Sequence, residues 1–121
     1  MQFLLLIYHQ EANEEKMTES ELGAMHQEYR ELVGDLQSKK QYVGGNPLKP
    51  TSTATTVRLR DGKKLVTDGP FAETKEQLGG YFLVEAHNLD EAIAMAERIP
   101  AARTGSIEVR PIQPLAQQVT A

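Results

Sequence analysis

Apolar residues recur along this chain with two different periods, and the change of period marks its elements. The run from Phe3 to Tyr8 is continuously apolar, which is typical of a strand that is covered on at least one face. The run has six residues, lacks a basic segment before it and has no small-residue cleavage site after it. It is therefore too short for a membrane span and does not resemble a signal peptide.

A helical period follows. Thr18 and Glu21 form a capping-box pattern, in which a hydroxyl and a carboxylate each satisfy a free amide at a helix start. Apolar residues then recur three and four positions apart from Leu22 to Leu36, which lines one face of a helix. These signals predict a helix over residues 19–38.

The second half of the chain alternates with the period of strands. Residues 55–60 and 65–66 alternate around the turn dipeptide Asp61-Gly62, which predicts a hairpin. Further strands are predicted at residues 42–43, 81–84 and 107–109, and a helix is predicted to start at Asn88 and to stop before Pro100. We expect the inner face of that helix to be formed by Leu89, Ala92, Ile93 and Ala96.

The order of these elements predicts a ferredoxin-like α+β fold, with an antiparallel sheet and two helices on one face. The first strand is apolar on both sides, so helices on one face leave an apolar sheet surface uncovered. Pairing of two such surfaces removes them from water, and we expect a homodimer. We assign residues 1–113 to a single domain and predict that the polar tail, residues 114–121, is mobile.

Composition narrows the classes of function. The chain has 121 residues, a net charge of −4 and no cysteine. The acidic balance argues against a nucleic-acid footprint, and the absence of thiols excludes zinc–thiolate sites and cysteine nucleophiles. No phosphate loop or dinucleotide fingerprint is present, so we expect no NAD, ATP, metal or other cofactor. We expect a cytoplasmic protein, without membrane contact.

Candidate chemistry centres on the tetrad Asp68-Gly69-Pro70-Phe71, which interrupts a strand pattern. A buried Asp68 can serve as a general base, and Gly69 and Phe71 would then shape a ligand pocket beside it. Asp before Gly-Pro is also a favoured turn starter whose side chain caps local amides. Both interpretations of Asp68 remain open from the residues alone.

Partners for this carboxylate are expected on the first helix. His26 and Tyr29 lie three residues apart, so both can project from one helix face. An imidazole such as that of His26 can donate a hydrogen bond to a carboxylate, and Tyr29 carries a hydroxyl that needs a partner when it is buried. Core packing is the alternative for each. Arg58 and Arg110 lie on predicted strands, where a guanidinium can face either solvent or an anionic ligand.

Several segments together resemble the YCII-related superfamily, specifically its DGPF-domain branch. They are FLLLIY at residues 3–8, ATTVR at 54–58, VTDGPFAETKEQLGGY at 66–81, LDEAIAMA at 89–96, IPAAR at 99–103 and IEVRPI at 107–112. The resemblance implies a dimeric α/β barrel of ferredoxin-like subunits. It also implies a histidine–aspartate pair whose aspartate corresponds to Asp68. In the family, the histidine lies on the first helix at a fixed spacing before a glycine that opens the second strand. Lys40 occupies the position of that glycine here. The same spacing counted back from Lys40 reaches Tyr29, and His26 lies one helical turn earlier.

Two functions follow as hypotheses. The first is a cofactor-independent lyase, isomerase or related proton-transfer enzyme acting on an anionic or phenolic small molecule, with Asp68, His26 and Tyr29 as catalytic residues. The ligand would be held by Arg58, Arg110, Gly69 and Phe71. The second is a non-catalytic ligand-binding or regulatory module associated with ECF-type sigma factors in transcription, which the resemblance implies.

Overall fold

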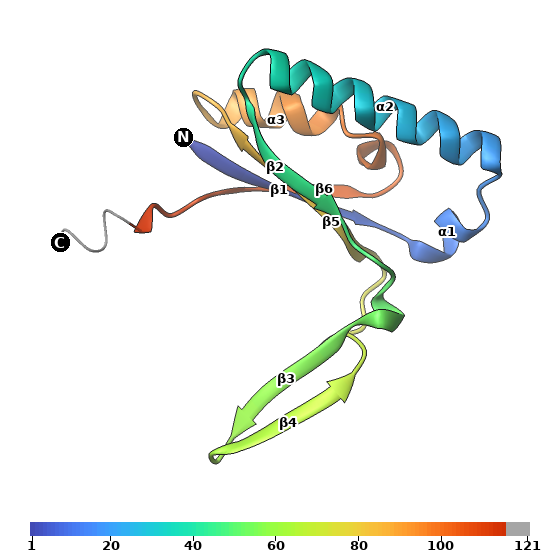
Figure 1. Cartoon of the computed structure of the whole chain (residues 1–121), viewed down its shortest axis with the longest axis vertical. Helices are drawn as coiled ribbons and strands as arrows, with labels where there is room; N and C mark the ends of the chain where they lie inside the picture. The colour runs from blue at the N-terminus through green and yellow to red at the C-terminus, as the bar shows by residue number, and fades with distance from the viewer. Residues whose placement is uncertain (116–121) are drawn as a thin grey trace.

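The structure is a computed structural model that describes residues 1–115 (Figure 1). Within this range the elements follow in the order β1 (Gln2–His9), α1 (Glu11–Glu15), α2 (Glu19–Ser38), β2 (Tyr42–Pro47), η1 (Thr51–Thr53), β3 (Thr55–Arg60), β4 (Lys63–Asp68), β5 (Gln77–Glu85), α3 (Leu89–Glu97), η2 (Pro100–Arg103) and β6 (Ser106–Pro111). The two η elements are short 3₁₀ helices. No helix in residues 1–115 is both long and apolar enough to cross a membrane.

Four strands form one antiparallel sheet in the order β2-β5-β1-β6. Figure 1 shows α2 and α3 on the same face of this sheet. The arrangement is compatible with the predicted ferredoxin-like α+β fold. We refer to the sheet and its helices as the body, and to the sheet face opposite the helices as the open face.

The core lies between the sheet and the helices. Alternate residues of β1 point into it, so that Phe3 and Leu5 are at most 1% exposed, while the residues between them are only partly buried. Val84 on β5, Leu36 on α2 and Ile99 after α3 complete the fully buried set. This single-sided burial is the expected pattern for a sheet that is covered on one face.

Helix α2 has the predicted bounds, and its N-terminus forms the predicted capping box. The Thr18 side chain accepts a hydrogen bond from the Glu21 amide at 3.1 Å, and the Thr18 amide donates to Glu21 Oε1 at 3.1 Å. Only Leu32 and Leu36 are buried, and both lie in the C-terminal half of the helix. The N-terminal half is therefore less closely packed on the sheet.

Helix α3 differs in part from the prediction. Asn88 caps it as expected by accepting a hydrogen bond from the Glu91 amide at 2.9 Å. Its buried face consists of Ala92, Met95 and Ala96, whereas Leu89 and Ile93 are 50% and 40% exposed. The prediction was therefore right for Ala92 and Ala96 and wrong for Leu89 and Ile93, and it missed Met95.

The predicted hairpin is confirmed, but it is not part of the main sheet. Strands β3 and β4 form a separate two-stranded sheet, which we call the arm (residues 55–68). Its turn residues Asp61 and Gly62 have φ values of 52° and 74°, as a tight hairpin turn with a left-handed backbone requires. The arm projects away from the body on the side opposite the helices (Figure 1).

The boundaries of two predicted elements also shift. Strand β2 continues through both glycines to Pro47, beyond the predicted residues 42–43. Of the predicted tail, only residues 114 and 115 are described; the rest of that prediction lies outside the described residues.

Candidate functional site

A cleft of about 1300 Å³ opens between α2 and the helix-facing side of the sheet. It lies beside the N-terminal half of α2, where that helix has no fully buried residue. Residues of α1, the end of β1, β2, the start of β5 and η2 complete its walls. The cleft is thus framed entirely by the body.

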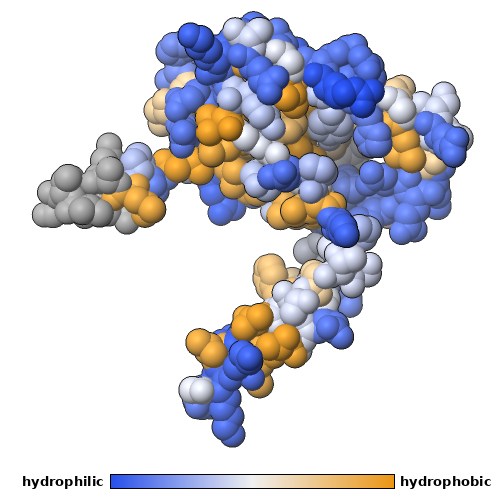
Figure 2. Space-filling model, viewed as in Figure 1, coloured by the Kyte–Doolittle hydropathy of each residue, from blue (hydrophilic) through white to orange (hydrophobic). Residues whose placement is uncertain are grey.

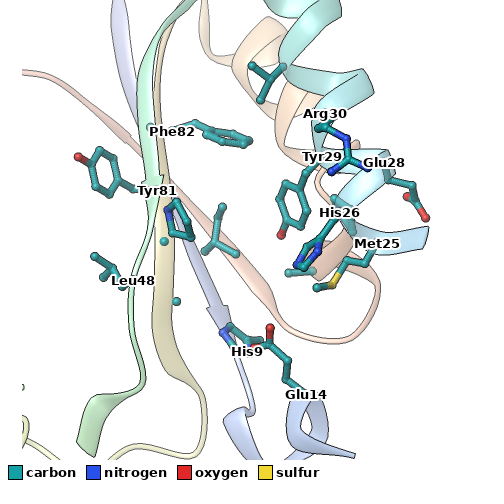
Figure 3. A pocket seen from close by; sticks show the side chains of 18 of the residues that line it. His9, Glu14, Met25, His26, Glu28, Tyr29, Arg30, Leu48, Tyr81 and Phe82 are labelled. Carbon is teal, nitrogen blue, oxygen red and sulfur yellow. Dashed lines mark ion pairs between the residues drawn. The ribbon is translucent and has the colours of Figure 1, made fainter. Parts of the chain in front are cut away.

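Aromatic rings form one wall of the cleft. The Phe82 ring makes edge-to-face contacts with Tyr29 and Tyr42, at centroid distances of 6.2 Å and 5.9 Å. In Figure 3, Phe82 projects from the sheet while Tyr29 projects from α2 toward it. Gly45 allows this packing, because a Cβ at that position would lie 2.5 Å from Phe82 Cδ1. Phe82 itself is buried, so the wall presents the partly buried rings of Tyr29 and Tyr42 to the cleft.

His9, at the end of β1, supplies an imidazole to the same cleft. Its Nδ1 lies 3.4 Å from Glu14 Oε2, and its side chain is 21% exposed. The register of β1 and β5 shifts at this end of the strands, and a Cβ on Gly79 would overlap the His9 ring. A side chain at Gly105 would overlap the neighbouring Tyr8 carbonyl oxygen. Gly79 on β5 therefore makes room for the His9 ring, and Gly105, just before β6, makes room for the backbone at Tyr8 and His9.

Helix α2 contributes the two residues that its spacing predicted. His26 and Tyr29 both line the cleft, and Figure 3 shows their side chains on the sheet-facing side of the helix. His26 is exposed, whereas Tyr29 is partly buried and packs on the core. Burial raises the pKa of the Tyr29 phenol above its usual value, with a backbone hydrogen bond from Ala101 opposing that rise. Tyr29 is thus held as a neutral hydroxyl that can donate.

Charged groups at the rim are mostly paired with one another. Arg103 on η2 donates from one nitrogen to both carboxylate oxygens of Glu28, at 2.9 Å and 3.0 Å. Arg30 donates to Gln27 Oε1 at 2.9 Å. The Arg30 acceptor is a neutral amide, but the carboxylates of Glu14, Glu21 and Glu28 also line the cleft, so the cleft favours a neutral or phenolic molecule over a strong anion.

The other predicted site residues do not reach this cleft within one chain. Asp68 and Arg58 lie on the arm, and both are exposed. Arg110 is paired with Glu108 on β6, where its register partner on β1 is Leu4, so it belongs to the open face. The predicted set is divided because the hairpin forms a sheet of its own. None of these three residues lines the cleft.

The rest of the tetrad forms the connection after the arm. Gly69 has a φ of 95°, a conformation that favours glycine, and its amide donates to the Ala54 carbonyl at 2.7 Å. Its carbonyl accepts from the Thr56 hydroxyl at 2.8 Å. Phe71 is 79% exposed. In a single chain the tetrad therefore closes the base of the arm and encloses no pocket.

His9 and Glu14 are the residues that we did not predict as a site. The sequence places His9 at the end of an apolar strand. Its contact with Glu14 depends on helix α1, which has no apolar periodicity from which it could be predicted. The pair of glycines that accommodates His9 becomes meaningful only once strand pairing is known. Within residues 1–115, no group of three or more His, Cys, Asp or Glu residues is arranged to hold a metal ion.

Comparisons with known proteins agree with the resemblance found in the sequence. The profile of the YCII-related domain matches residues 1–116. An uncharacterised protein of Rhizobium meliloti (strain 1021) is 51% identical over 67 residues, which cover 54% of this chain and 54% of that protein. The match thus spans about half the length of each protein.

Proposed function

The chain belongs to the YCII-related domain family, and from this premise we propose that it is a small cofactor-independent enzyme that moves a proton on an aromatic molecule bound between α2 and the sheet. One observation carries the proposal. Two imidazoles and a phenol, from His9, His26 and Tyr29, line a single cleft that has an aromatic wall. Convergent titratable groups in the largest hollow of a domain are the usual mark of an active site.

Binding would rest on the aromatic wall. A planar molecule placed against the rings of Tyr29 and Tyr42, which the buried Phe82 supports, would contact an apolar surface and exclude water from the adjacent polar groups. Our first hypothesis named an anionic or a phenolic molecule. Because three carboxylates line the cleft and one of its two arginines is paired with Glu28, a phenol or a neutral carbonyl compound fits better than an anion.

Proton transfer would use His9 as the base. Glu14, whose Oε2 lies 3.4 Å from His9 Nδ1, would orient the ring at the cleft. Tyr29, a phenol whose pKa burial raises further above neutrality, would donate a hydrogen bond to the developing oxyanion. His26 would return a proton from the opposite wall.

The test is exchange of an activated carbon-bound proton. Phenylacetone, a neutral aromatic ketone, is incubated with the full-length protein in D₂O, and loss of its α-proton signals is followed by NMR. We expect catalysed exchange that falls about a hundredfold or more in His9→Gln and Tyr29→Phe. His87→Gln is the matched control, because His87 pairs with Glu91 outside the cleft. Equal rates in His9→Gln and His87→Gln would contradict the proposal.

The second hypothesis, a regulatory module that associates with an ECF-type sigma factor, uses the same cleft as an effector site. That module would be favoured if the ketone binds without any proton exchange and if the Tyr29→Phe variant binds it with unchanged affinity. Either role is compatible with the cytoplasm, which we propose as its location.

The proposal includes the homodimer. The open face carries partly buried apolar residues on β1 and β5, including Leu4, Leu6 and Leu83, and no helix of residues 1–115 lies over them. Packing of two open faces about a twofold axis would bury these side chains and create a dimeric α/β barrel. Light scattering at micromolar concentration tests it, with a monomer as the contradicting result.

A further inference from the structure

The arm has two chemically different faces. Directly paired residues share a face, so Val57, Val66 and Leu59 lie together on one side, with Lys64 opposite Leu59 near the tip. We call this the apolar face of the arm; Asp68 lies at its base, paired with Thr55. The opposite face carries Arg58, Arg60, Lys63 and Leu65. An amphipathic hairpin of this kind is built to rest on another surface.

Nothing in the body serves as that surface. Val57, Leu59 and Val66 are 61%, 69% and 53% exposed, although their strands are fully paired with each other. A lone two-stranded hairpin is only marginally stable in water. Figure 2 shows apolar side chains gathered along the arm, and Figure 1 shows the arm extending away from the sheet. The arm therefore gains most by packing against something outside its own chain.

The position of the arm indicates what that is. It leaves the body on the side of the open face, so both uncovered apolar surfaces border the same space (Figure 1). Six residues per strand extend about 20 Å, whereas packed sheets lie about 10 Å apart. The arm is thus longer than the distance between two packed sheets, so it would extend along the side of a second sheet packed on the open face.

Charge favours a second copy of the chain as the occupant. The outer half of the arm carries Arg60, Lys63 and Lys64, none of which forms an ion pair within residues 1–115. The body presents exposed carboxylates at the end of α1 and on the first turn of α2, namely Glu15, Glu19 and Glu21. Each copy thus offers a basic arm tip and an acidic surface, as a twofold interface requires.

We propose that the arm is a clasp whose apolar face packs against a second copy of this chain, and that this contact encloses Asp68 at the subunit interface. The inference rests on the homodimer proposed above and adds the element that holds it. It also gives the tetrad a place: the Asp68 carboxylate, exposed in one chain, becomes part of the contact between the subunits.

The first test compares the two faces of the arm. In the full chain, Val57→Thr, Leu59→Thr and Val66→Thr are combined, because threonine keeps the strand propensity while removing apolar surface. The control combines Arg58→Thr and Leu65→Thr on the opposite face. Sedimentation equilibrium should show the dimer dissociation constant rising about a hundredfold or more in the apolar-face variant and within about tenfold in the control. Unchanged circular dichroism and an unchanged unfolding midpoint of the body would show that both variants fold.

The second test places the arm directly. The chain has no cysteine, so Lys63→Cys at the arm tip carries a single spin label. The spin-labelled protein is made without ¹⁵N and is mixed with ¹⁵N-labelled wild type that carries no spin label. Only contacts between copies can then broaden the observed amide signals. We expect broadening of body residues in the wild-type partner.

The outcomes separate the clasp from the dimer. A wild-type dimer whose stability is equal in both arm variants, with no broadening, would overturn the clasp and leave the open-face dimer standing. A wild-type monomer would overturn both. Neither result bears on proton exchange at the cleft, which is measured separately.

Discussion

The body and the arm are built from strands with the same alternation, yet they differ completely in burial. In the body, Phe3, Leu5 and Val84 are at most 1% exposed, while Val57 and Leu59 in the arm are 61% and 69% exposed. The difference lies in what covers them. Two helices lie over one face of the main sheet, and no helix of residues 1–115 lies over the arm (Figure 1). Alternation therefore identifies a strand but not the surface that its apolar side will meet.

The contrast also separates two roles. The body encloses the cleft with its histidines and tyrosine, whereas the arm carries the motif aspartate on an uncovered apolar face. On our account the body performs the chemistry and the arm joins the subunits. Four predictions test this division within the chain.

The largest effect is expected from shortening a core side chain. Leu36→Ala should lower the free energy of unfolding by about 2–5 kcal/mol, because it leaves a cavity between α2 and the sheet. Val57→Ala in the arm should change it by at most about 0.5 kcal/mol. Urea denaturation at a protein concentration below the dimer dissociation constant measures both changes in the free energy of unfolding. Equal losses would mean that the arm packs on its own body.

A second contrast uses two glycines of the body. Gly79→Ala should cost about 1–3 kcal/mol and displace the His9 ring, because the added Cβ overlaps that ring. Gly23→Ala, where nothing lies within 4 Å of the added carbon, should stabilise α2 by about 0.5–1 kcal/mol. Urea denaturation and the NMR signals of His9 report the two effects. An unmoved His9 in Gly79→Ala would refute the close approach.

The cap of α2 should contribute less. Thr18→Ala removes the hydroxyl that accepts from the Glu21 amide, and should cost about 1 kcal/mol. Hydrogen exchange should speed up in the first turn of α2 and stay unchanged in the arm. Faster exchange in the arm would show that the two regions are coupled within one chain.

The smallest effect is a pH dependence. The pKa of Tyr29 is raised in the folded protein, so its contribution to stability is complete below the unfolded-state pKa and is lost as pH rises through the folded one. In Tyr29→Phe the decline of stability above about pH 10 should therefore be less steep than in the wild type. Parallel curves for the two proteins would show that Tyr29 is not titrating in a buried setting.

Much of the fold could be predicted from sequence because its signals are local. The Thr18–Glu21 capping box, the period from Leu22 to Leu36 and the Asp61-Gly62 turn each act within a few residues. Helix α1 was missed, since its five residues present no apolar stripe to predict. The inner face of α3 was misplaced at Leu89 and Ile93 because a short helix admits more than one apolar arc.

The site was only half predictable. The helical spacing of His26 and Tyr29 correctly put both on one side of α2, where they line the cleft. The expected meeting of these residues with Asp68 required the arm to fold back over the body, and strand pairing alone does not determine that. His9 depends on a strand bulge and on Gly79, contacts between segments about 70 residues apart that a linear pattern does not reveal.

The central claim is that the working site is the cleft in the body rather than the motif on the arm. Titration of the full-length ¹⁵N-labelled protein with phenylacetone, followed by amide and imidazole NMR signals, tests it most directly. We predict that signals of His9, His26, Tyr29 and Phe82 shift together and saturate with one affinity, while those of Val57 and Val66 stay in place. Saturating shifts confined to the arm around Asp68, with the cleft signals unmoved, would contradict the account.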